Sequence, residues 1–353
     1  MIAIITPSQR LSRVLANPSA GAILLLVILV AAMSVAFPSF FTGINATNVS
    51  NQMVFVLLLA LGMTVVLITG GIDLSVGSVM GLSAGVGAYT ITAGAPLVAG
   101  LLTTMAVGAF LGLLNGLMIT KLGLPDFIAT LAMLGIARGA LFLWTGGVPI
   151  IGYMLPEYYV ISGSQPFGFT TVPILIAIVA IIGVTVVLKY TSYGRHAYGM
   201  GSNPHAAVLS GVPVDRIKVI AYMISGLMAG VAGMIMAGRN TTVAPTMGLG
   251  YEVTAIAAAI IGGAALGGGR GSAFGAVIGA LVLSITANAI NIAGVNSSWQ
   301  QVVIGGVLLL AVVFDRASSI MRARSARLAT RQVSSGNTDS SRMTGGISPK
   351  KEG

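Results

Sequence analysis

Few residues in this chain could take part in chemistry, because only 7% of its 353 residues are charged. Asp73 and Ser75 lie in GGIDLSVGS, and Arg138 lies inside a long apolar stretch. Charged groups in apolar surroundings need a partner, water or a polar solute. The two histidines, His196 and His205, are too few for a metal site on their own. With no cysteine and no set of acid, base and nucleophile, the sequence predicts neither a metal site nor a catalytic centre.

Asp73 and Arg138 each admit more than one interpretation. Asp73 follows two glycines and precedes helix-favouring residues, so it can cap a helix that starts near residue 75. It can also belong to a broken helix that lines a path for solute, with Ser75 facing that path. A buried arginine costs about 2.5–3.5 kcal/mol. Arg138 must therefore snorkel, pair with Asp73 or Asp126, or face water, and we expect Arg138→Leu to impair function.

The longest polar interruption is GSNPHAAVLSGVPVDRIK, residues 201–218. Asn203 suits an N-cap, and Pro204 suits the first helical position, where its missing N–H is no loss. Gly211 suits the left-handed residue that ends a helix, with Pro213 just beyond it. The pattern predicts one short helix at about 204–210. Because so short a helix is unstable alone in water, it packs either on its own protein or on a partner.

Almost all of the rest of the chain is apolar. The mean hydropathy is +0.96, and 56% of the residues are hydrophobic. Apolar runs long enough to cross about 30 Å of hydrocarbon recur along the sequence. They predict an all-α polytopic membrane protein with about ten transmembrane helices, at 20–37, 49–69, 75–93, 97–120, 126–146, 171–189, 219–238, 253–266, 273–293 and 299–314. The range 253–266 is the shortest, so it is the first that we would drop from the list of transmembrane helices.

The distribution of positive charge gives the orientation. With the N-terminus inside, every lysine and arginine lies at the inner side except Arg239, which is outside, and Arg138, which is within a span. The net charge of +10 thus reflects topology and not nucleic-acid binding. We expect a cytoplasmic N-terminal segment at 1–19, a transmembrane domain at 20–315 with an inner loop at 190–218, and a cytoplasmic, disordered tail at 316–353. A cleavable signal peptide is the rival interpretation of the first apolar run.

Five spans precede the outer loop 147–170 and five follow it. An odd number of spans in each half would make the two halves inverted, a common transporter plan. VGAFLGLLNGLMI (107–119) aligns weakly with IGALVLSITANAI (278–290), which places Asn115 and Asn288 at similar positions. Chance similarity between helices rich in glycine and alanine explains this alignment about as well.

The stretch NPHAAVLSGVPVDRIKV resembles the coupling loop of ABC-transporter permeases, with Ala206, Ala207 and Gly211 at the pattern's positions and His205 where the family often has Glu. GGIDLSVGSVMGLSAG (70–85), GRHAYGMGSN (194–203) and the stretch 250–280 resemble the ribose/xylose-type monosaccharide permeases. The resemblance covers about residues 50–315. It implies that the short helix docks an ATPase through residues Asn203, Pro204, His205, Ala206, Ala207, Leu209, Ser210 and Gly211.

The resemblance also implies the partners and the mechanism. Two permease copies, expected to be a homodimer in the bacterial inner membrane and in contact with its lipids, would form the pore. A cytoplasmic ABC ATPase would drive alternating access, and a periplasmic sugar-binding protein would deliver the substrate. This chain has no G-x-x-x-x-G-K-[ST], so we expect ATP to be used by the partner subunit and no cofactor here.

Two other interpretations remain. An ion-coupled secondary transporter of a small polar solute would need carboxylates inside the bundle, and only Asp73 is a candidate. A membrane enzyme or scaffold lacks a catalytic set. For a sugar pore, the candidate residues are Asp73, Ser75, Asn115, Arg138 and Asn288. Further amides and an aromatic residue are also available to a sugar, namely Asn51, Gln52, Asn291, Trp299, Gln300 and Gln301.

Overall fold

A computed structural model describes residues 18–151, 171–296, 298–310 and 312–313, and its regular elements are helices. A short 3-10 helix η1 (Pro38–Phe41) follows the first of them. The α-helices are α2 (Pro18–Ala36), α3 (Gly43–Ile68), α4 (Val76–Thr92), α5 (Leu97–Lys121), α6 (Asp126–Thr145), α8 (Val172–Tyr190), α9 (Ser192–Ser202), α10 (Pro204–Leu209), α11 (Val214–Asn240), α12 (Tyr251–Ile261) and α13 (Ala273–Ile292), followed by a helix at Ser298–Leu310.

Each of the ten predicted apolar ranges overlaps one of these helices. Six helices, α3, α5, α6, α8, α11 and α13, are long and apolar enough to cross a membrane. Four apolar helices are shorter, in α2, α4, α12 and Ser298–Leu310. The chain is therefore a multi-pass membrane protein. The predictions for 1–17, 152–170 and 314–353, including the disordered tail, fall outside the described residues.

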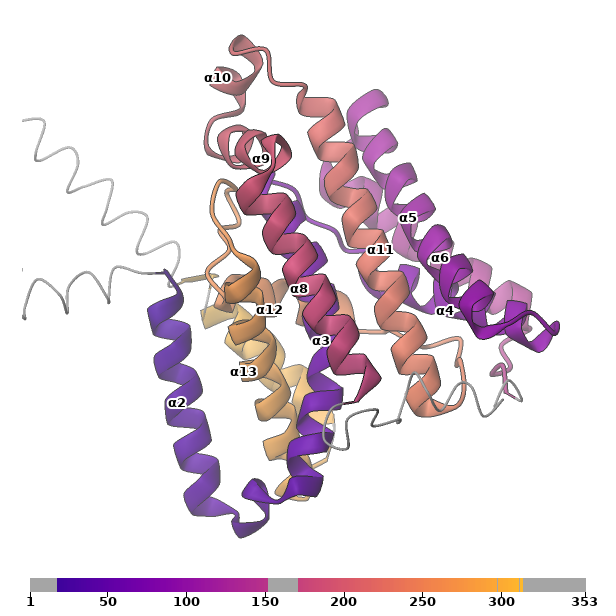
Figure 1. The fold of residues 1–353 in the computed structure, drawn as a ribbon, viewed down its shortest axis with the longest axis vertical. Coiled ribbons are helices and arrows are strands. Elements are labelled where there is room, and N and C mark those ends of the chain that lie inside the picture. Colours follow the sequence, from indigo (N-terminus) through magenta and orange to yellow (C-terminus); the bar gives the residue numbers. More distant parts are fainter. Residues whose placement is uncertain (1–17, 152–170, 297, 311, 314–353) are drawn as a thin grey trace, which may run out of the picture. The chain divides into compact units, whose positions relative to one another are not determined.

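Helices α3 and α11 lie at the centre of the described packing (Figure 1). Every α3 residue from Val54 to Ile68 is buried, because apolar side chains cover all sides of this helix. Helix α11 approaches α5 at glycines: a Cβ atom on Gly226 would lie 2.1 Å from the carbonyl oxygen of Gly108. Small residues at such contacts let the two backbones pack closely within a bilayer.

Each of the two central helices packs against one short helix and one long helix. Helix α11 packs against α4 and α5, and α3 packs against α12 and α13. The short helices α4 and α12 each follow an irregular segment, 69–75 and 241–250 respectively. At the α12–α13 contact, a Cβ atom on Gly279 would lie 1.8 Å from the carbonyl oxygen of Ala258, so this helix pair is as close as α5 and α11.

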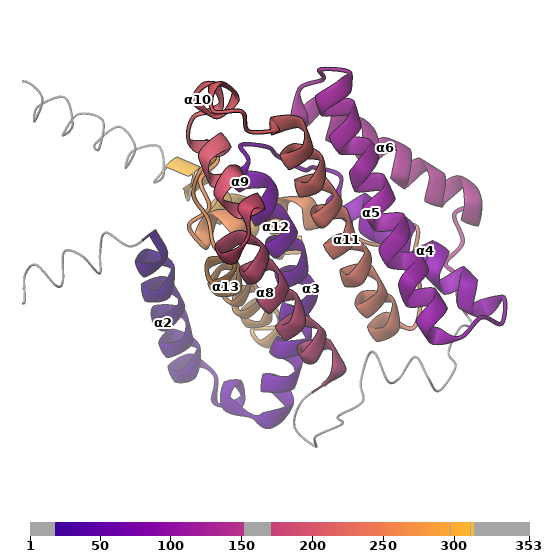
Figure 2. The ribbon, with the colours of Figure 1, turned by 45° about the horizontal axis from the view of Figure 1, so that its top comes forward.

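Helices α9 and α10 lie at the end of the bundle where α11 begins (Figures 1 and 2). The sequence predicted only one short helix within 190–218, and α9 was missed. Its sequence, SYGRHAYGMGS, contains three glycines, which disfavour helix in isolation. The helix is held by its surroundings instead: Gly194 lies against the backbone of Leu188, and Gly201 lies against the carbonyl oxygen of Ile68.

Candidate functional site

The predicted short helix is α10, and its ends have the expected geometry. The Asn203 side-chain oxygen accepts a hydrogen bond from the Ala206 amide at 3.0 Å, and Pro204 opens the helix. Gly211 has φ +76°, and the Val212 amide donates to the carbonyl oxygen of Ala207 at 3.0 Å. The N-cap, the proline and the left-handed glycine are therefore confirmed as local structure.

The surface of α10 is mostly uncovered. Ala207 is the residue of this helix that is buried, at 7% exposure. The side chains of Val208 and Leu209 are 61% and 89% exposed. Pro204, His205, Ala206, Ser210 and Gly211 are exposed as well. Because six residues cannot hold a helix by their own hydrogen bonds, the exposed apolar pair is a surface that a partner can cover.

Helix α9 contacts segments at the ends of other helices. The Tyr198 hydroxyl donates to the carbonyl oxygen of Gly271 at 2.8 Å, and the Tyr193 hydroxyl donates to that of Ile217 at 3.4 Å. Burial raises the pKa of both phenols above their usual value, so both stay protonated donors at neutral pH. The Gly269 amide also donates to the carbonyl oxygen of Ile68, at 2.9 Å.

A buried polar cluster surrounds Asp73 in the irregular segment 69–75. Asp73 Oδ1 accepts from the Ser75 amide at 3.0 Å and from the Ser75 hydroxyl at 2.6 Å. Its Oδ2 accepts from the Ser225 hydroxyl of α11 at 2.8 Å. Asn115 of α5 donates to Ser75 Oγ at 2.8 Å. These four residues are at most 1% exposed, and the cluster ties the segment 69–75 to α5 and α11.

The predicted N-cap role of Asp73 is wrong in its position. Ser75 occupies the N-cap position of α4 without a side-chain capping hydrogen bond, and Asp73 lies two residues earlier. The carboxylate serves the chain just ahead of the helix, because it accepts the amide of the capping residue itself. Asp73 and Ser75 lie in the irregular segment 69–75 between α3 and α4, but Ser75 is buried in the cluster, and a solute path along this segment stays a prediction.

A second set of contacts links the same break to the start of α11. The Tyr222 hydroxyl donates to the carbonyl oxygen of Ile72 at 3.1 Å. The Lys218 ammonium lies 2.7 Å from Asp126 Oδ1. A Cβ atom on Gly71 would lie 2.7 Å from the Tyr222 hydroxyl and 2.8 Å from Asp126 Oδ2, so a larger residue there would push these two side chains aside. Residues 71–73 are therefore held by α6 and α11 together.

Arg138 is half-buried and pairs with neither expected carboxylate. Its guanidinium donates to the carbonyl oxygens of Met247 at 2.6 Å and Pro245 at 3.2 Å. The prediction of Asp73 or Asp126 as its partner is wrong, since Asp73 is satisfied by serines and Asp126 by Lys218. Arg138 instead holds the irregular segment 241–250 against α6, and Glu252 lies close enough to interact with its charge.

Asn288 lies apart from the Asp73 cluster. It exchanges two hydrogen bonds with Asn45, at 2.8 and 3.2 Å, which join α13 to the start of α3. Its sequence counterpart Asn115 bonds within the other half of the chain. The five residues predicted for the pore thus fall at three places: the cluster of Asp73, Ser75 and Asn115, and the separate contacts of Arg138 and Asn288.

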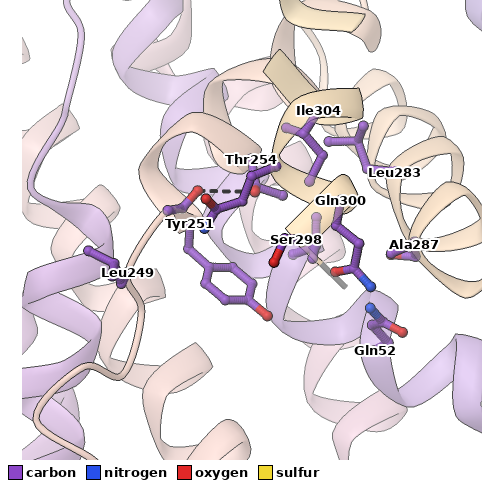
Figure 3. A pocket seen from close by; sticks show the side chains of 13 residues that line it. Gln52, Leu249, Tyr251, Thr254, Leu283, Ala287, Ser298, Gln300 and Ile304 are labelled. Carbon is purple, nitrogen blue, oxygen red and sulfur yellow. Dashed lines mark hydrogen bonds between the residues drawn. The ribbon is translucent and has the colours of Figure 1, made fainter. Parts of the chain in front are cut away.

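A pocket of about 350 Å³ lies between the N-terminal part of α3, α12, α13 and the helix Ser298–Leu310 (Figure 3). Seven of its lining side chains carry an amide or hydroxyl group: Gln52, Tyr251, Thr254, Ser284, Ser298, Gln300 and Gln301. Figure 3 shows the amides of Gln52 and Gln300 pointing toward each other. The three glutamines were among the amides predicted as available to a sugar, whereas the hydroxyl residues were missed because no local pattern marks them.

A family model described as "Branched-chain amino acid transport system / permease component" matches residues 45–312. The ribose import permease protein RbsC of Bacillus subtilis is 40% identical over 299 residues, covering 85% of this chain and 93% of the relative. RbsC of Escherichia coli K12 is 38% identical, covering 82% and 91%. The L-arabinose ABC transporter permease protein AraH of Azospirillum brasilense is 32% identical, covering 84% and 87%. No solved structure matches significantly.

These matches extend over most of the chain, from the beginning of α3 to the end of the described residues. They include the segment 69–75, α10 and every helix that lines the pocket. The chain therefore belongs to this family of membrane transport permeases, in which its relatives include ribose and L-arabinose import permeases.

Proposed function

We propose that this chain is the transmembrane permease subunit of an ATP-driven ABC importer, which carries a monosaccharide such as ribose or xylose across the bacterial inner membrane. The relatives are import permeases for ribose and L-arabinose, which supports this substrate class. The relatives are permease components, so ATP hydrolysis belongs to a separate ATPase subunit.

The observation that carries the proposal is the surface of α10. This helix is anchored by one buried alanine and leaves Val208 and Leu209 exposed. It lies between α9 and α11. Ser202 and Asn203 before it and Asp215 and Arg216 after it are polar and exposed, so α10 lies outside the apolar bundle. An apolar pair on such a helix fits a groove on a protein partner, and an ATPase subunit is the partner that an importer of this kind needs.

The contacts of α9 and α11 connect α10 to the bundle in two places, so a movement of the ATPase can be transmitted through both. On the N-terminal side of α10, Gly201 and Tyr198 contact the end of α3 and the loop 267–271. On the C-terminal side, Lys218 and Tyr222 reach Asp126 and Ile72 beside the broken segment. A displacement of α10 would therefore move residues 68–73 from both sides. Rigid helices that carry motion between such sites are a common device in alternating access.

The remaining partners follow from this role. The importer contains a second permease copy, which we take to be identical, and membrane lipids cover the outward apolar faces. A periplasmic sugar-binding protein docks at the end opposite α10. Both termini are cytoplasmic, with segment 1–19 and tail 316–353 flanking the transmembrane domain 20–315 and the coupling loop 190–218. The positive charges of the inner loops support this orientation.

We further propose ten spans in two inverted halves. Exchanging α3 with α11, α4 with α12 and α5 with α13 converts every packing pair observed among these six helices into a pair that is also observed among them. Both short helices in this exchange follow an irregular segment. An inverted repeat accounts for this pairing, because each half would then supply one central helix and one broken span.

An ion-coupled secondary transporter is supported less well. Its coupling ion would need a carboxylate that is free to bind it, and Asp73 already accepts three hydrogen bonds from Ser75 and Ser225. Lys218 pairs with the nearby Asp126. Neither carboxylate is thus poised for an ion or a proton.

Reconstitution into proteoliposomes tests the function. The chain together with its cognate ATPase, binding protein and ATP should accumulate radiolabelled ribose or xylose, and omission of the ATPase should abolish uptake. The chain alone should give no uptake in a proton or sodium gradient. Uptake by the lone chain in such a gradient would establish the secondary transporter instead.

Co-purification tests the docking surface. Gly211→Val should strain the end of α10, because φ is +76° there, and should weaken ATPase association roughly tenfold or more. Ala207→Asp should act in the same direction by removing the anchor of the helix. Gly294→Val is the matched control, since Gly294 also has positive φ and open surroundings but lies at the other end of the bundle. Equal recovery of the ATPase with all three variants would refute docking at α10.

A further inference from the structure

The lining of the pocket in Figure 3 is polar but carries no charge. Its seven amide and hydroxyl side chains come from α3, α12, α13 and the helix Ser298–Leu310, and none of the lining residues is Asp, Glu, Lys, Arg or His. A zwitterionic amino acid bound here would leave its ammonium and carboxylate without counter-charges, at a large desolvation cost. A neutral solute with many hydroxyl groups has no such cost.

The floor of the pocket contains an unused hydrogen-bonding group. Ser284 is 1% exposed, and its hydroxyl has no partner among the described residues. Two residues further along the same helix, the Thr286 hydroxyl donates to the carbonyl oxygen of Val282 at 2.7 Å. Buried polar groups are normally paired. Ser284 lines the pocket, and its covered hydroxyl is a polar group of this lining that no described residue satisfies.

Other polar groups of the pocket are available or fixed in a useful position. The side-chain amide of Gln52 forms no hydrogen bond with another described residue. The side-chain amide of Gln300 donates to Asn291 Oδ1 at 3.0 Å, which fixes its orientation. The Tyr251 ring stands against Phe55, with 5.7 Å between the ring centroids, so its position is set by α3. Amides and hydroxyls both donate and accept, which matches the hydroxyl groups of a sugar.

We propose that this pocket is a binding station for the permeating neutral monosaccharide, and that its uncharged lining excludes amino acids. The proposal rests on the proposed function of the chain. The volume, about 350 Å³, lies in the range of small-molecule sites. The floor of Val56, Leu283 and Ser284 is buried, whereas Ser298 and Gln301 at the rim are exposed, so a sugar can enter from that rim.

Fluorescence can test binding without transport. The chain has two tryptophans, Trp144 and Trp299, so the Trp144→Phe chain reports only from Trp299, beside the lining residues Ser298 and Gln300. Titration of this purified full-length chain with ribose, xylose or arabinose should give a saturable change for at least one sugar, and leucine should give none. A change with leucine, or none with any sugar, would overturn the proposal.

Two matched serine variants localise the signal. Ser284→Ala in the Trp144→Phe chain should raise the half-saturating sugar concentration at least threefold. Ser83→Ala should leave it unchanged, because Ser83 is equally buried and unpartnered but does not line the pocket. An equal effect of both substitutions would place the sugar elsewhere.

Reconstituted transport separates this proposal from the proposed function. In the complete importer, Ser284→Ala and Gln52→Leu should lower the amount of sugar carried per ATP hydrolysed, while ATP hydrolysis stimulated by the binding protein persists. An unchanged ratio in both variants, with ATP-driven uptake intact, would refute the binding station and leave the function standing. Sugar binding without ATP-driven uptake would refute the function and leave the station standing.

Discussion

Lys218 of α11 and Asp126 of α6 form an ion pair at 2.7 Å, beside the broken segment that follows α3. Both side chains are largely covered, with exposures of 22% and 17%. Lys218 lies four residues before Tyr222, whose hydroxyl donates a hydrogen bond to the carbonyl oxygen of Ile72. The ion pair therefore fixes the position of α11 at the point where motion from α10 would enter the bundle.

We predict that Lys218→Ala lowers the free energy of unfolding by roughly 1–3 kcal/mol and reduces uptake, because the Asp126 carboxylate loses its partner. The exchanged pair Lys218→Asp with Asp126→Lys should recover part of both. Thermal unfolding in detergent and ATP-driven uptake measure the two effects. Lys121→Ala is the control, because Lys121 pairs with Asp215 at the surface, where such a pair contributes about 0–1 kcal/mol. Equal losses in Lys218→Ala and Lys121→Ala would contradict this prediction.

The Asp73 cluster gives a graded prediction. Ser225→Ala removes one hydrogen bond to the buried carboxylate and should destabilise the chain by about 1–3 kcal/mol. Asp73→Asn replaces one carboxylate oxygen by an NH₂ group, which cannot accept the hydrogen bond of Ser75 or Ser225. This variant should destabilise the chain more than Ser225→Ala does. Ser83→Ala, which removes no hydrogen bond, should leave the unfolding temperature nearly unchanged. If Asp73→Asn unfolds at the wild-type temperature, the cluster is not what holds the break in place.

Arg138 gives a prediction about the segment 241–250. Arg138→Leu leaves the carbonyl oxygens of Met247 and Pro245 without their charged donor, which should cost about 1.5–3 kcal/mol. We expect slower uptake, because this segment leads directly into α12 and the polar pocket. Arg138→Lys keeps the charge but loses the two-carbonyl geometry, and should fall between Leu and wild type. Full uptake by the Leu variant at normal membrane levels would show that Arg138 is dispensable.

The close contact of α5 and α11 is testable by a single methyl group. Gly226→Ala would place its Cβ atom 2.1 Å from a backbone oxygen of Gly108, and the helices must separate, at a cost of about 1–3 kcal/mol. In Gly139→Ala, the added atom meets nothing within 4 Å. The unfolding temperature should therefore fall for the first variant and not for the second. A Gly226→Ala chain as stable as Gly139→Ala would mean that the two helices are further apart than described.

The sequence predicted what local patterns determine. Apolar runs located the helices, and the order of Asn203, Pro204 and Gly211 gave α10 with its caps, because each of these residues acts on its own neighbours. Helix α9 was missed because contacts with Leu188 and Ile68 stabilise it against its glycine content. A hint of it existed in Thr191, whose hydroxyl oxygen accepts the Gly194 amide at 3.4 Å.

Contacts between distant segments could not be predicted in the same way. The charge of Arg138 suggested a carboxylate partner, but the fold brings two backbone carbonyl groups to it, and any residue supplies those. The pocket likewise brings Gln52 of α3 together with Ser284 of α13 and Gln300 of the helix Ser298–Leu310, more than 200 residues later in the chain. Each of these residues is ordinary in its own stretch, and only the packing of these helices brings them together.

The most direct test of the account is the side of the membrane on which α10 lies. Because the chain has no cysteine, Leu209→Cys gives one exposed thiol on α10, and Val295→Cys gives a control at the opposite end of the bundle. A membrane-impermeant maleimide should label Leu209→Cys only in inside-out vesicles, and bound ATPase should block that labelling, whereas Val295→Cys should react only in right-side-out vesicles. Labelling of Leu209→Cys in right-side-out vesicles would contradict ATPase docking at α10 and the proposed importer with it.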